Sequence, residues 1–341
     1  MIPLPMSTPR SFTNTAAPVS TSLTGARRNR ITLALASLAT LALLALSLTV
    51  GVYDITGGER GWDIFLITRV PRTLALVLAG SAMAMCGLIM QLLTQNKFVE
   101  PSTTGTTEWA SLGLIAVMIL FPTAGLVPRM IGAIIFALVG TLVFFAFLER
   151  VSLKSSLIVP IVGIMLGAVV GSFTTFVALE TDTLQSLGIW FTGSFTGLVR
   201  GRYELLFLVL LVLIAAFVAA DRFTVAGLGK DVATNVGLNY RAVVFLGVFL
   251  VAIATGIVTV IVGRLPFLGL IVPNIVSMVR GDDLRSNLPW VMLLGVWVVT
   301  ICDLIARTII APFEMPVSVV LGIVGAAVFL VLVVRRNRHG R

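Results

Sequence analysis

The sequence predicts an all-α polytopic membrane protein with about ten transmembrane helices. Hydrophobic residues make up 58% of the 341 residues, charged residues make up 11%, and the mean hydropathy is +1.07. In a soluble domain, about a quarter of the residues are charged, so this composition does not suit a protein whose whole surface faces water. The apolar residues also gather in runs of about 20 residues, which is the length that a helix needs to cross a bilayer.

The first apolar run follows a polar N-terminal segment. Residues 1–30 are rich in Ser, Thr and Pro and end in two arginines, an asparagine and a third arginine, so we expect a disordered cytoplasmic tail. The run from Ile31 to Val50 has span length, and no small-residue cleavage site closes it. We therefore expect an uncleaved first helix and not a signal peptide.

Short polar segments divide the rest of the chain into further apolar runs. The eighth run is short and contains Pro273, so we expect that helix to be broken or tilted. The ten expected spans are 31–51, 73–95, 105–121, 130–148, 155–179, 204–220, 241–262, 266–280, 289–311 and 317–334.

The distribution of Lys and Arg predicts that both termini lie in the cytoplasm. With alternating spans, 16 of the 24 Lys and Arg residues fall on the N-terminal side of the membrane, including the basic tail 337–341 and its flank. Cytoplasmic loops carry this excess of positive charge. The outer side then holds Arg60, Arg69, Arg72, Arg129, Arg200, Arg202, Arg264 and Arg307.

The sequence lacks the residue patterns that several classes of function require. The net charge of +9 follows from the charged cytoplasmic loops, and no basic run beside aromatic residues suggests nucleic-acid binding. Cys86 and Cys302 lie in apolar runs, and His339 is the single histidine, so we expect no metal or cofactor bound by this chain. Neither H-E-x-x-H nor G-x-x-x-x-G-K-[ST] occurs, so we expect no intramembrane protease site and no nucleotide hydrolysis.

Ion-coupled transport is a weaker alternative. Such transporters place ionisable groups at membrane depth, and the expected spans are almost free of them. Asp303 and Arg307 are the exception, and their spacing of four places them on one helical face. If the chain moves a solute uphill, the energy is expected to enter from a partner, for which the segment 221–241 between spans six and seven offers a cytoplasmic docking site.

Four stretches of the sequence resemble one family. They are RVPRTLALVLAG with the following GLIMQLLTQNKFVEP, then GKDVATNVGLN, then GRLPFLGLIVPN, and then DLIARTIIAPFEMPVSVVLG. Their order and spacing are similar to those of the FecCD-type (BtuC-like) permeases of ABC importers, in the iron-siderophore branch. The resemblance covers residues 31–336. The chain departs from the family pattern at Asn96 to Val99, where NKFV replaces Asn-Pro-Leu-Ala.

The resemblance implies a fold and a set of partners. It implies ten helices in which spans 2–5 and 7–10 form inverted repeats. It also implies a second permease subunit, identical or paralogous, two cytoplasmic ATPase subunits that carry ATP and Mg, and an extracytoplasmic siderophore-binding protein. The implied location is the bacterial cytoplasmic membrane.

The resemblance also assigns roles to matching residues. Arg69, Arg72 and Arg307 would dock the binding protein, because an arginine fork can hold a carboxylate through two parallel hydrogen bonds. The residues assigned to ATPase coupling are Gly229, Lys230, Asp231, Ala233 and Gly237. The residues assigned to the translocation path and inner gate are Gln91, Asn96, Lys97, Phe98, Ser155 and Ser156.

These observations predict the permease subunit of an ATP-driven importer for a ferric siderophore of the catecholate or mixed type. A haem or vitamin B12 permease is the nearer alternative, and an ion-coupled secondary transporter is the more distant one. The chain itself is expected not to be an enzyme.

Overall fold

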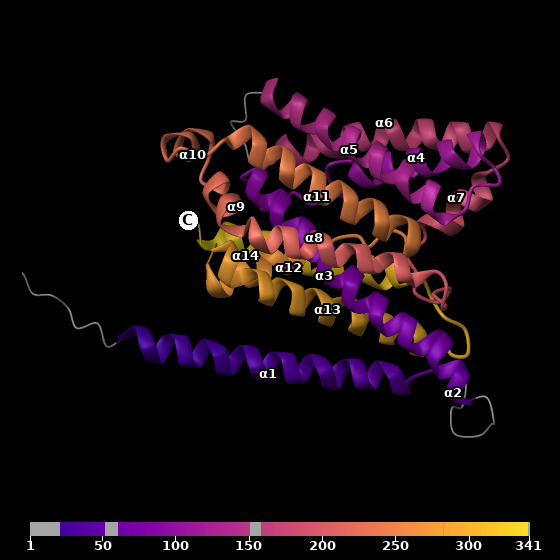
Figure 1. Cartoon of the computed structure of the whole chain (residues 1–341), viewed down its shortest axis with the longest axis horizontal. Helices are drawn as coiled ribbons and strands as arrows, with labels where there is room; N and C mark the ends of the chain where they lie inside the picture. Colours follow the sequence, from indigo (N-terminus) through magenta and orange to yellow (C-terminus); the bar gives the residue numbers. More distant parts are fainter. Residues whose placement is uncertain (1–20, 52–60, 151–157, 282, 340–341) are drawn as a thin grey trace, which may run out of the picture. The chain divides into compact units, whose positions relative to one another are not determined.

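The regular elements of this computed structural model are helical throughout the residues it describes, which are 21–51, 61–150, 158–281 and 283–339. The chain divides into two units, residues 1–39 and residues 40–341. In the first unit, the described residues belong to helix α1 (Thr21–Thr49), which begins well before the apolar run at Ile31. Residues 21–30, which we expected in the tail, are therefore helical. Figure 1 shows the helices in chain order.

The second unit holds the end of α1 and the remaining helices. Long helices that match the expected spans alternate with short helices that connect them. In order they are α2 (Gly61–Ile64), the π-helical turn Phe65–Arg69, α3 (Val70–Leu93), α4 (Thr106–Leu120), α5 (Leu126–Arg150), α6 (Ile158–Glu180), α7 (Leu184–Phe191), the 3₁₀ turn Tyr203–Phe207, α8 (Leu208–Val218), α9 (Ala220–Gly227), α10 (Lys230–Asn235), α11 (Tyr240–Ile261), α12 (Leu268–Arg280), α13 (Leu284–Thr308) and α14 (Val317–His339).

Among the described residues, six helical stretches are long and apolar enough to cross a membrane. They are Asn29–Thr49, Gly61–Leu93, Leu126–Arg150, Ile158–Glu180, Tyr240–Ile261 and Leu284–Thr308. A seventh candidate is the pair Tyr203–Val218 and Ala220–Gly227, which is bent by 60°, and α4, α12 and the first part of α14 are shorter apolar helices. The predicted all-α polytopic class is confirmed, and each expected span has a helix at its place.

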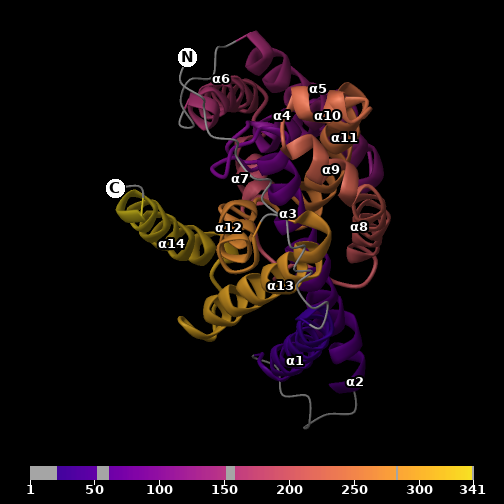
Figure 2. The ribbon, with the colours of Figure 1, turned by 90° about the vertical axis from the view of Figure 1, so that its left-hand side faces the viewer.

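Helix α3 lies at the centre of the second unit. It contacts α8, α9, α11, α12 and α13, and Figure 2 shows it between α12 and α13 on one side and α9 and α11 on the other. Small residues allow this close packing. A Cβ atom added at Gly80 would lie 3.0 Å from the carbonyl oxygen of Gly295, and one added at Gly87 would lie 1.9 Å from that of Gly269. These helices therefore meet backbone to backbone.

The start of α3 accommodates Pro71 by a change of helix type. Proline has no N–H for the carbonyl four residues earlier, and its ring crowds that carbonyl. The chain widens into the π-helical turn Phe65–Arg69 directly before this point, and the released carbonyl oxygen of Ile67 accepts a hydrogen bond from the backbone N–H of Arg200 at 3.1 Å. The expected span started at residue 73, but helical structure already begins at Gly61.

A second group of helices consists of α4, α5 and α6, which lie together in Figure 1. Helix α4 contacts both α5 and α6, and α5 also contacts α11. Glycines again mark the crossings, because a Cβ atom at Gly113 would lie 2.3 Å from the carbonyl oxygen of Gly132. Helices α4 and α6 of this group line the cavity described below.

Candidate functional site

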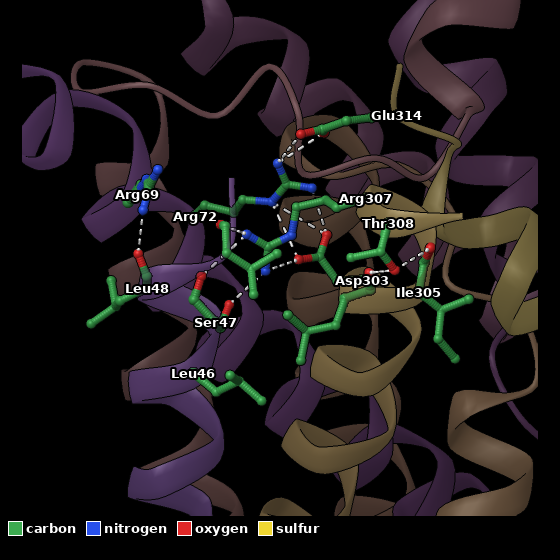
Figure 3. A network of polar contacts seen from close by, with 12 residues as sticks. Leu46, Ser47, Leu48, Arg69, Arg72, Asp303, Ile305, Arg307, Thr308 and Glu314 are labelled. Atoms are coloured by element: carbon green, nitrogen blue, oxygen red, sulfur yellow. Dashed lines mark hydrogen bonds and ion pairs between the residues drawn. The ribbon is translucent and has the colours of Figure 1, made fainter. Parts of the chain in front are cut away.

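Arg72 stands at the centre of a group of charged side chains where α1, α3 and α13 meet. Its Nη2 atom lies 2.8 Å from Asp303 Oδ1, and its Nη1 atom lies 2.9 Å from Glu314 Oε2. Asp303 also pairs with Arg307 one turn along α13, at 3.0 Å, as their spacing of four predicts. We call Arg69, Arg72, Asp303, Arg307 and Glu314 the arginine cluster (Figure 3).

Two arginines of this cluster bind the last carbonyl groups of α1. Arg307 donates to the carbonyl oxygen of Val50 at 2.8 Å and to Ser47 Oγ at 2.8 Å. Arg69 donates to the carbonyl oxygens of Leu48 at 2.7 Å and Thr49 at 3.0 Å. The last carbonyl groups of a helix have no partner within the helix, so these arginines act as its C-terminal cap.

Glu314 was not among the predicted site residues. It lies in the loop between α13 and α14, and it accepts a hydrogen bond from Thr196 Oγ1 at 2.6 Å in addition to the Arg72 pair. Burial acts to raise the pKa of this carboxyl, but the Thr196 hydroxyl and the Arg72 guanidinium outweigh burial and hold the pKa below its usual range. Its place beside Pro316 in the fourth quoted stretch was the available signal in the sequence.

The arginine cluster is largely closed to solvent. The Arg307 and Asp303 side chains are 4% and 1% exposed, and the Arg72 side chain is 12% exposed. The guanidinium groups of Arg72 and Arg307 already hold carboxylates of this chain. The structure thus brings the three predicted docking arginines together and shows them in a structural role, while their docking role stays a prediction.

The loop between α3 and α4 carries a second group of polar side chains. Asn274 of α12 donates to the carbonyl oxygen of Lys97 at 2.7 Å, and Lys97 Nζ donates to Ser277 Oγ at 2.7 Å. Asn96 Oδ1 accepts from the backbone N–H of Phe98 at 2.9 Å. We call Gln91, Asn96, Lys97, Glu100 and Asn274 the loop cluster. It fixes this loop on one face of α12.

Gln91 has a defined structural partner in α12. Pro273 cannot donate to the carbonyl four residues earlier, which is that of Gly269. Gln91 Nε2 donates to this carbonyl oxygen at 3.2 Å, so α12 continues through Pro273 from Leu268 to Arg280. We expected this helix to be broken or tilted, and it is not broken at Pro273, because another helix supplies the missing donor.

Glu100 is the member of the loop cluster that sequence reasoning missed. Its carboxylate accepts from the backbone N–H of Phe267 at 3.0 Å and from the Ser102 hydroxyl, and the backbone amides of Gly269 and Leu270 also face it. Glu100 therefore caps the N-terminus of α12. Burial of this side chain, which is 2% exposed, raises its pKa to about 7 despite these hydrogen bonds.

The predicted gate residues are placed only in part. Phe98 of the same loop meets the ring of Phe329 in α14 edge to face, with 5.9 Å between the ring centroids. Ser155 and Ser156 lie outside the described residues. The structure therefore brings Gln91, Asn96, Lys97 and Phe98 together near α12.

The predicted coupling segment folds as two short helices, α9 and α10. Gly229 joins them with a φ of +110°, and Gly237 ends α10 with a φ of +83°. The backbone N–H of Leu238 donates to the carbonyl oxygen of Ala233, and that of Gly237 donates to Thr234, which is the hydrogen-bond pattern of a glycine C-cap. Lys230 and Asp231 open α10, and Ala233 is buried. The predicted coupling segment is thus a pair of short helices with a glycine on each side of α10.

No group of three or more His, Cys, Asp or Glu side chains with the geometry for a metal ion occurs in the part of the chain that the structure describes. The polar groups gather instead at helix ends and loops. Such an arrangement holds helices together and can present a path or a docking surface.

Comparison with known proteins identifies the family. The FecCD transport family matches residues 31–335. The chain belongs to this family. As a FecCD protein with several membrane-spanning helices, it is a multi-pass protein of the bacterial cytoplasmic membrane.

Several characterised FecCD proteins are similar to this chain over most of their length. The petrobactin import system permease protein FatD of Bacillus anthracis is 57% identical over 307 residues, which cover 90% of this chain and 92% of the relative. The petrobactin import system permease protein YclN of Bacillus subtilis is 41% identical and covers 88% and 96%. The ferric-anguibactin transport system permease protein FatD of Vibrio anguillarum is 37% identical and covers 87% and 97%.

A solved structure shares the fold of this FecCD chain. It is described as an inward-facing conformation of a metal-chelate-type ABC transporter, and it superposes with a TM-score of 0.78 over 90% of this chain and 99% of the other, at 23% identity. The predicted family and the predicted fold class are confirmed.

Proposed function

We propose that this chain is the permease subunit of an ATP-driven ABC importer for a ferric siderophore of the petrobactin type. The similarity that carries the proposal is the 57% identity to a petrobactin permease over nine-tenths of the chain. Two further relatives are named for petrobactin and for ferric anguibactin. All three names describe permease proteins of import or transport systems.

The proposal is tested by growth and uptake in a deletion strain. Iron-starved cells that lack this chain are supplied with ferric petrobactin, ferric anguibactin or haem as the single iron source, and uptake of vitamin B12, a cobalt complex without iron, is measured separately. We expect loss of uptake for one or both ferric siderophores and unchanged uptake of haem and vitamin B12. Normal uptake of both siderophores with loss of haem or vitamin B12 uptake would support the alternative.

We further propose that α9 and α10 seat in a separate ATPase subunit. Support comes from the hinge at Gly229 and the cap at Gly237, which hold a short helix on a loop in a shape suited to docking. Gly237→Trp tests this role, and Gly201→Trp is a matched control because Gly201 also has a positive φ and open space around its Cβ position. We expect the Gly237 variant to lose uptake and ATPase stimulation and the Gly201 variant to retain both.

The inner gate is proposed to include Gln91, Asn96, Lys97 and Phe98, together with Ser155 and Ser156. The fixed position of the loop cluster on α12 supports this assignment. Cysteines at Asn96 or Ser155 are expected to crosslink to a second permease subunit when the importer is closed. The absence of crosslinks and of any nucleotide-dependent change in labelling at both positions would overturn the assignment.

The outer docking role of Arg69, Arg72 and Arg307 is the remaining proposal about partners. Because these arginines also hold α1 and α13, a charge reversal alone would confuse docking with folding. Rescue of uptake for Arg72→Glu by a Glu→Arg change on the binding protein would support docking. Failure of every such pair, in variants that insert normally, would leave the arginines with the structural role alone.

A further inference from the structure

A cavity of about 790 Å³ lies between α4, α6 and α7. Its wall includes Glu108 and Ser111 of α4, the Gly171 region of α6, Phe191 of α7 and Arg264 from the turn between α11 and α12. Figure 1 shows these three helices side by side. The volume is in the range of pockets that hold a small organic ligand. No predicted site residue lies in this cavity.

Arg264 is held at the cavity wall by its backbone. Gly263 before it has a φ of +98° and packs against Gly193, where a Cβ atom on Gly263 would lie 2.8 Å from the Gly193 Cα. The backbone N–H of Ser194 donates to the carbonyl oxygen of Val262 at 2.9 Å. These contacts fix the turn, so the direction of the Arg264 side chain follows from close backbone packing.

The Arg264 guanidinium is only partly satisfied. Its Nη1 atom lies 3.3 Å from Glu108 Oε1, against 2.8 Å for the Arg72–Asp303 pair, and its Nη2 atom donates to Ser111 Oγ at 3.0 Å. The Nε atom is buried without a partner. The Arg264 side chain is 37% exposed. Its guanidinium is therefore accessible from the cavity, and its ion pair with Glu108 is long.

The rest of the wall suits a large ligand with flat groups. Arg264 stacks over the Phe191 ring, with 5.2 Å from its Cζ atom to the centroid. On α6, a Cβ atom at Gly171 would meet only Glu108 Cγ, at 3.7 Å, so this part of the helix leaves space. Hydroxyl groups of Ser172 and Thr175 line the same face. The site combines the Arg264–Glu108 pair, hydroxyl groups, of which that of Thr175 donates to the carbonyl oxygen of Gly171, and aromatic surface.

We propose that this cavity is an intermediate binding site for an anionic iron chelate during transport. We propose that Arg264 makes this site selective for anionic chelates, an inference that rests on the proposed function. Fe³⁺ is a hard ion that favours oxygen donors, and a chelator that supplies more than three deprotonated oxygens leaves the complex with net negative charge. An arginine binds such oxygens through two donors at once. The chelate takes the place of the Glu108 carboxylate at the guanidinium.

The first test measures uptake by the complete importer reconstituted in proteoliposomes, with ferric petrobactin as the probe. Arg264→Gln should raise KM about tenfold, as expected for loss of a charge-assisted hydrogen-bond pair, and Arg264→Lys should restore part of it. Arg129→Gln is the matched control, because Arg129 also stacks over an aromatic ring, Trp190, and has a buried Nε atom without a partner. A KM within about twofold of wild type for Arg264→Gln would overturn the proposal.

The second test reads occupancy of the cavity directly, without transport. Ser172→Cys places a thiol in the wall, Thr181→Cys places one in the exposed turn directly after α6 and outside the wall, and Cys86 and Cys302 are buried. Ferric petrobactin should slow maleimide labelling at position 172 and not at 181, and a neutral ferric trihydroxamate should protect less. Equal protection by both chelates, or protection that survives Arg264→Gln, would overturn selection by this arginine.

The two arms separate the inference from the proposed function. Wild-type proteoliposomes that import no ferric siderophore would contradict the proposed function. If wild-type proteoliposomes import the siderophore and Arg264→Gln has the wild-type KM, only the intermediate binding site is contradicted. If Arg264→Gln does not insert, the Arg264→Lys variant and the labelling arm decide.

Discussion

The arginine cluster and the loop cluster both bury charged side chains, and they stabilise them in different ways. In the arginine cluster, Arg72 and Arg307 share the carboxylate of Asp303, so charges of opposite sign compensate one another. In the loop cluster, Glu100 lies among backbone amides and a serine hydroxyl and forms no ion pair with any residue in the described part of the chain. The first arrangement joins three helices, and the second caps one helix.

The difference has a consequence for protonation. A buried carboxylate with a cation beside it keeps its charge, while the amide dipoles around Glu100 offset only part of the cost of desolvation. Glu314 and Glu100, the loop members of the two clusters, accordingly have pKa values shifted in opposite directions. The clusters should therefore respond differently to mutation and to pH.

The largest expected effect is that of Asp303→Asn. This change leaves two buried guanidinium groups without their shared carboxylate, and breaking a buried ion pair in this way costs about 3–5 kcal/mol. The measurement is denaturant unfolding of the purified protein in detergent. Asp221→Asn is the control, because Asp221 and Arg285 form a pair at 2.6 Å that is mostly exposed and should contribute about 0–1 kcal/mol. Equal losses in the two variants would remove the distinction between buried and exposed pairs.

Glu100→Ala should have the next largest effect. It removes the acceptor for the first backbone amides of α12, and unsatisfied buried donors cost about 1–3 kcal/mol. Glu100→Gln keeps one acceptor and should lose less. The same unfolding experiment checks the order of the three proteins, and a Gln variant less stable than the Ala variant would show that the carboxylate is not the helix cap.

The pH dependence of stability should separate the clusters by sign. The pKa of Glu100 is about 7 in the folded protein and near 4.3 in an unfolded chain. The folded state therefore binds this proton more tightly, so stability falls as pH rises through this window, by up to about 3 kcal/mol. Glu314 has a lowered pKa, so its contribution is present above the usual pKa of a glutamate and is lost as pH falls.

Melting temperatures between pH 4 and pH 8 check both slopes. Glu100→Gln should flatten the fall toward neutral pH, and Glu314→Gln should flatten the loss at acid pH. A Glu100→Gln variant with the wild-type slope would assign the fall to another group.

Glu314→Gln should have the smallest effect at neutral pH. Arg72 keeps its pair with Asp303, and Glu314 is 18% exposed, so the loss should be about 1 kcal/mol. Thermal unfolding beside Asp303→Asn measures it. A loss as large as that of the Asp303 variant would mean that Arg72 depends on both carboxylates equally.

The helices were predictable from the sequence because a lipid environment requires helical structure in long apolar segments. Backbone groups within a bilayer must be paired inside the segment, so each long apolar run, such as 241–262, has to be a helix, and α11 covers Tyr240–Ile261. The turn before Pro71 and the continuity of α12 were not predictable in this way. They depend on Arg200 and Gln91, which lie far away in the chain and supply donors to carbonyls that proline leaves free.

The sequence was enough to predict which arginines belong to the candidate site. It was not enough to predict which side chains they contact. The pair Asp303–Arg307 followed from helical spacing, because both ends lie on one helix. Glu314 and Ser47 meet the arginines only through tertiary packing, and Thr196 meets Glu314 in the same way. Arg264 was counted only as an outer charge, since nothing in its local sequence shows the cavity that α4, α6 and α7 form around it.

The cap on α1 sets an order of events during synthesis. Arg69 follows Thr49 by 20 positions, and Arg307 follows Val50 by 257. At roughly 5–20 residues per second, a ribosome delivers Arg69 within a few seconds and Arg307 tens of seconds later. The C-terminal cap of α1 is therefore completed in two stages. The donor from Arg307 becomes available only when nearly the whole polypeptide has been made. A nascent chain that stops before Arg307 therefore lacks the donor for the carbonyl oxygen of Val50, so the C-terminal cap of its first helix stays incomplete.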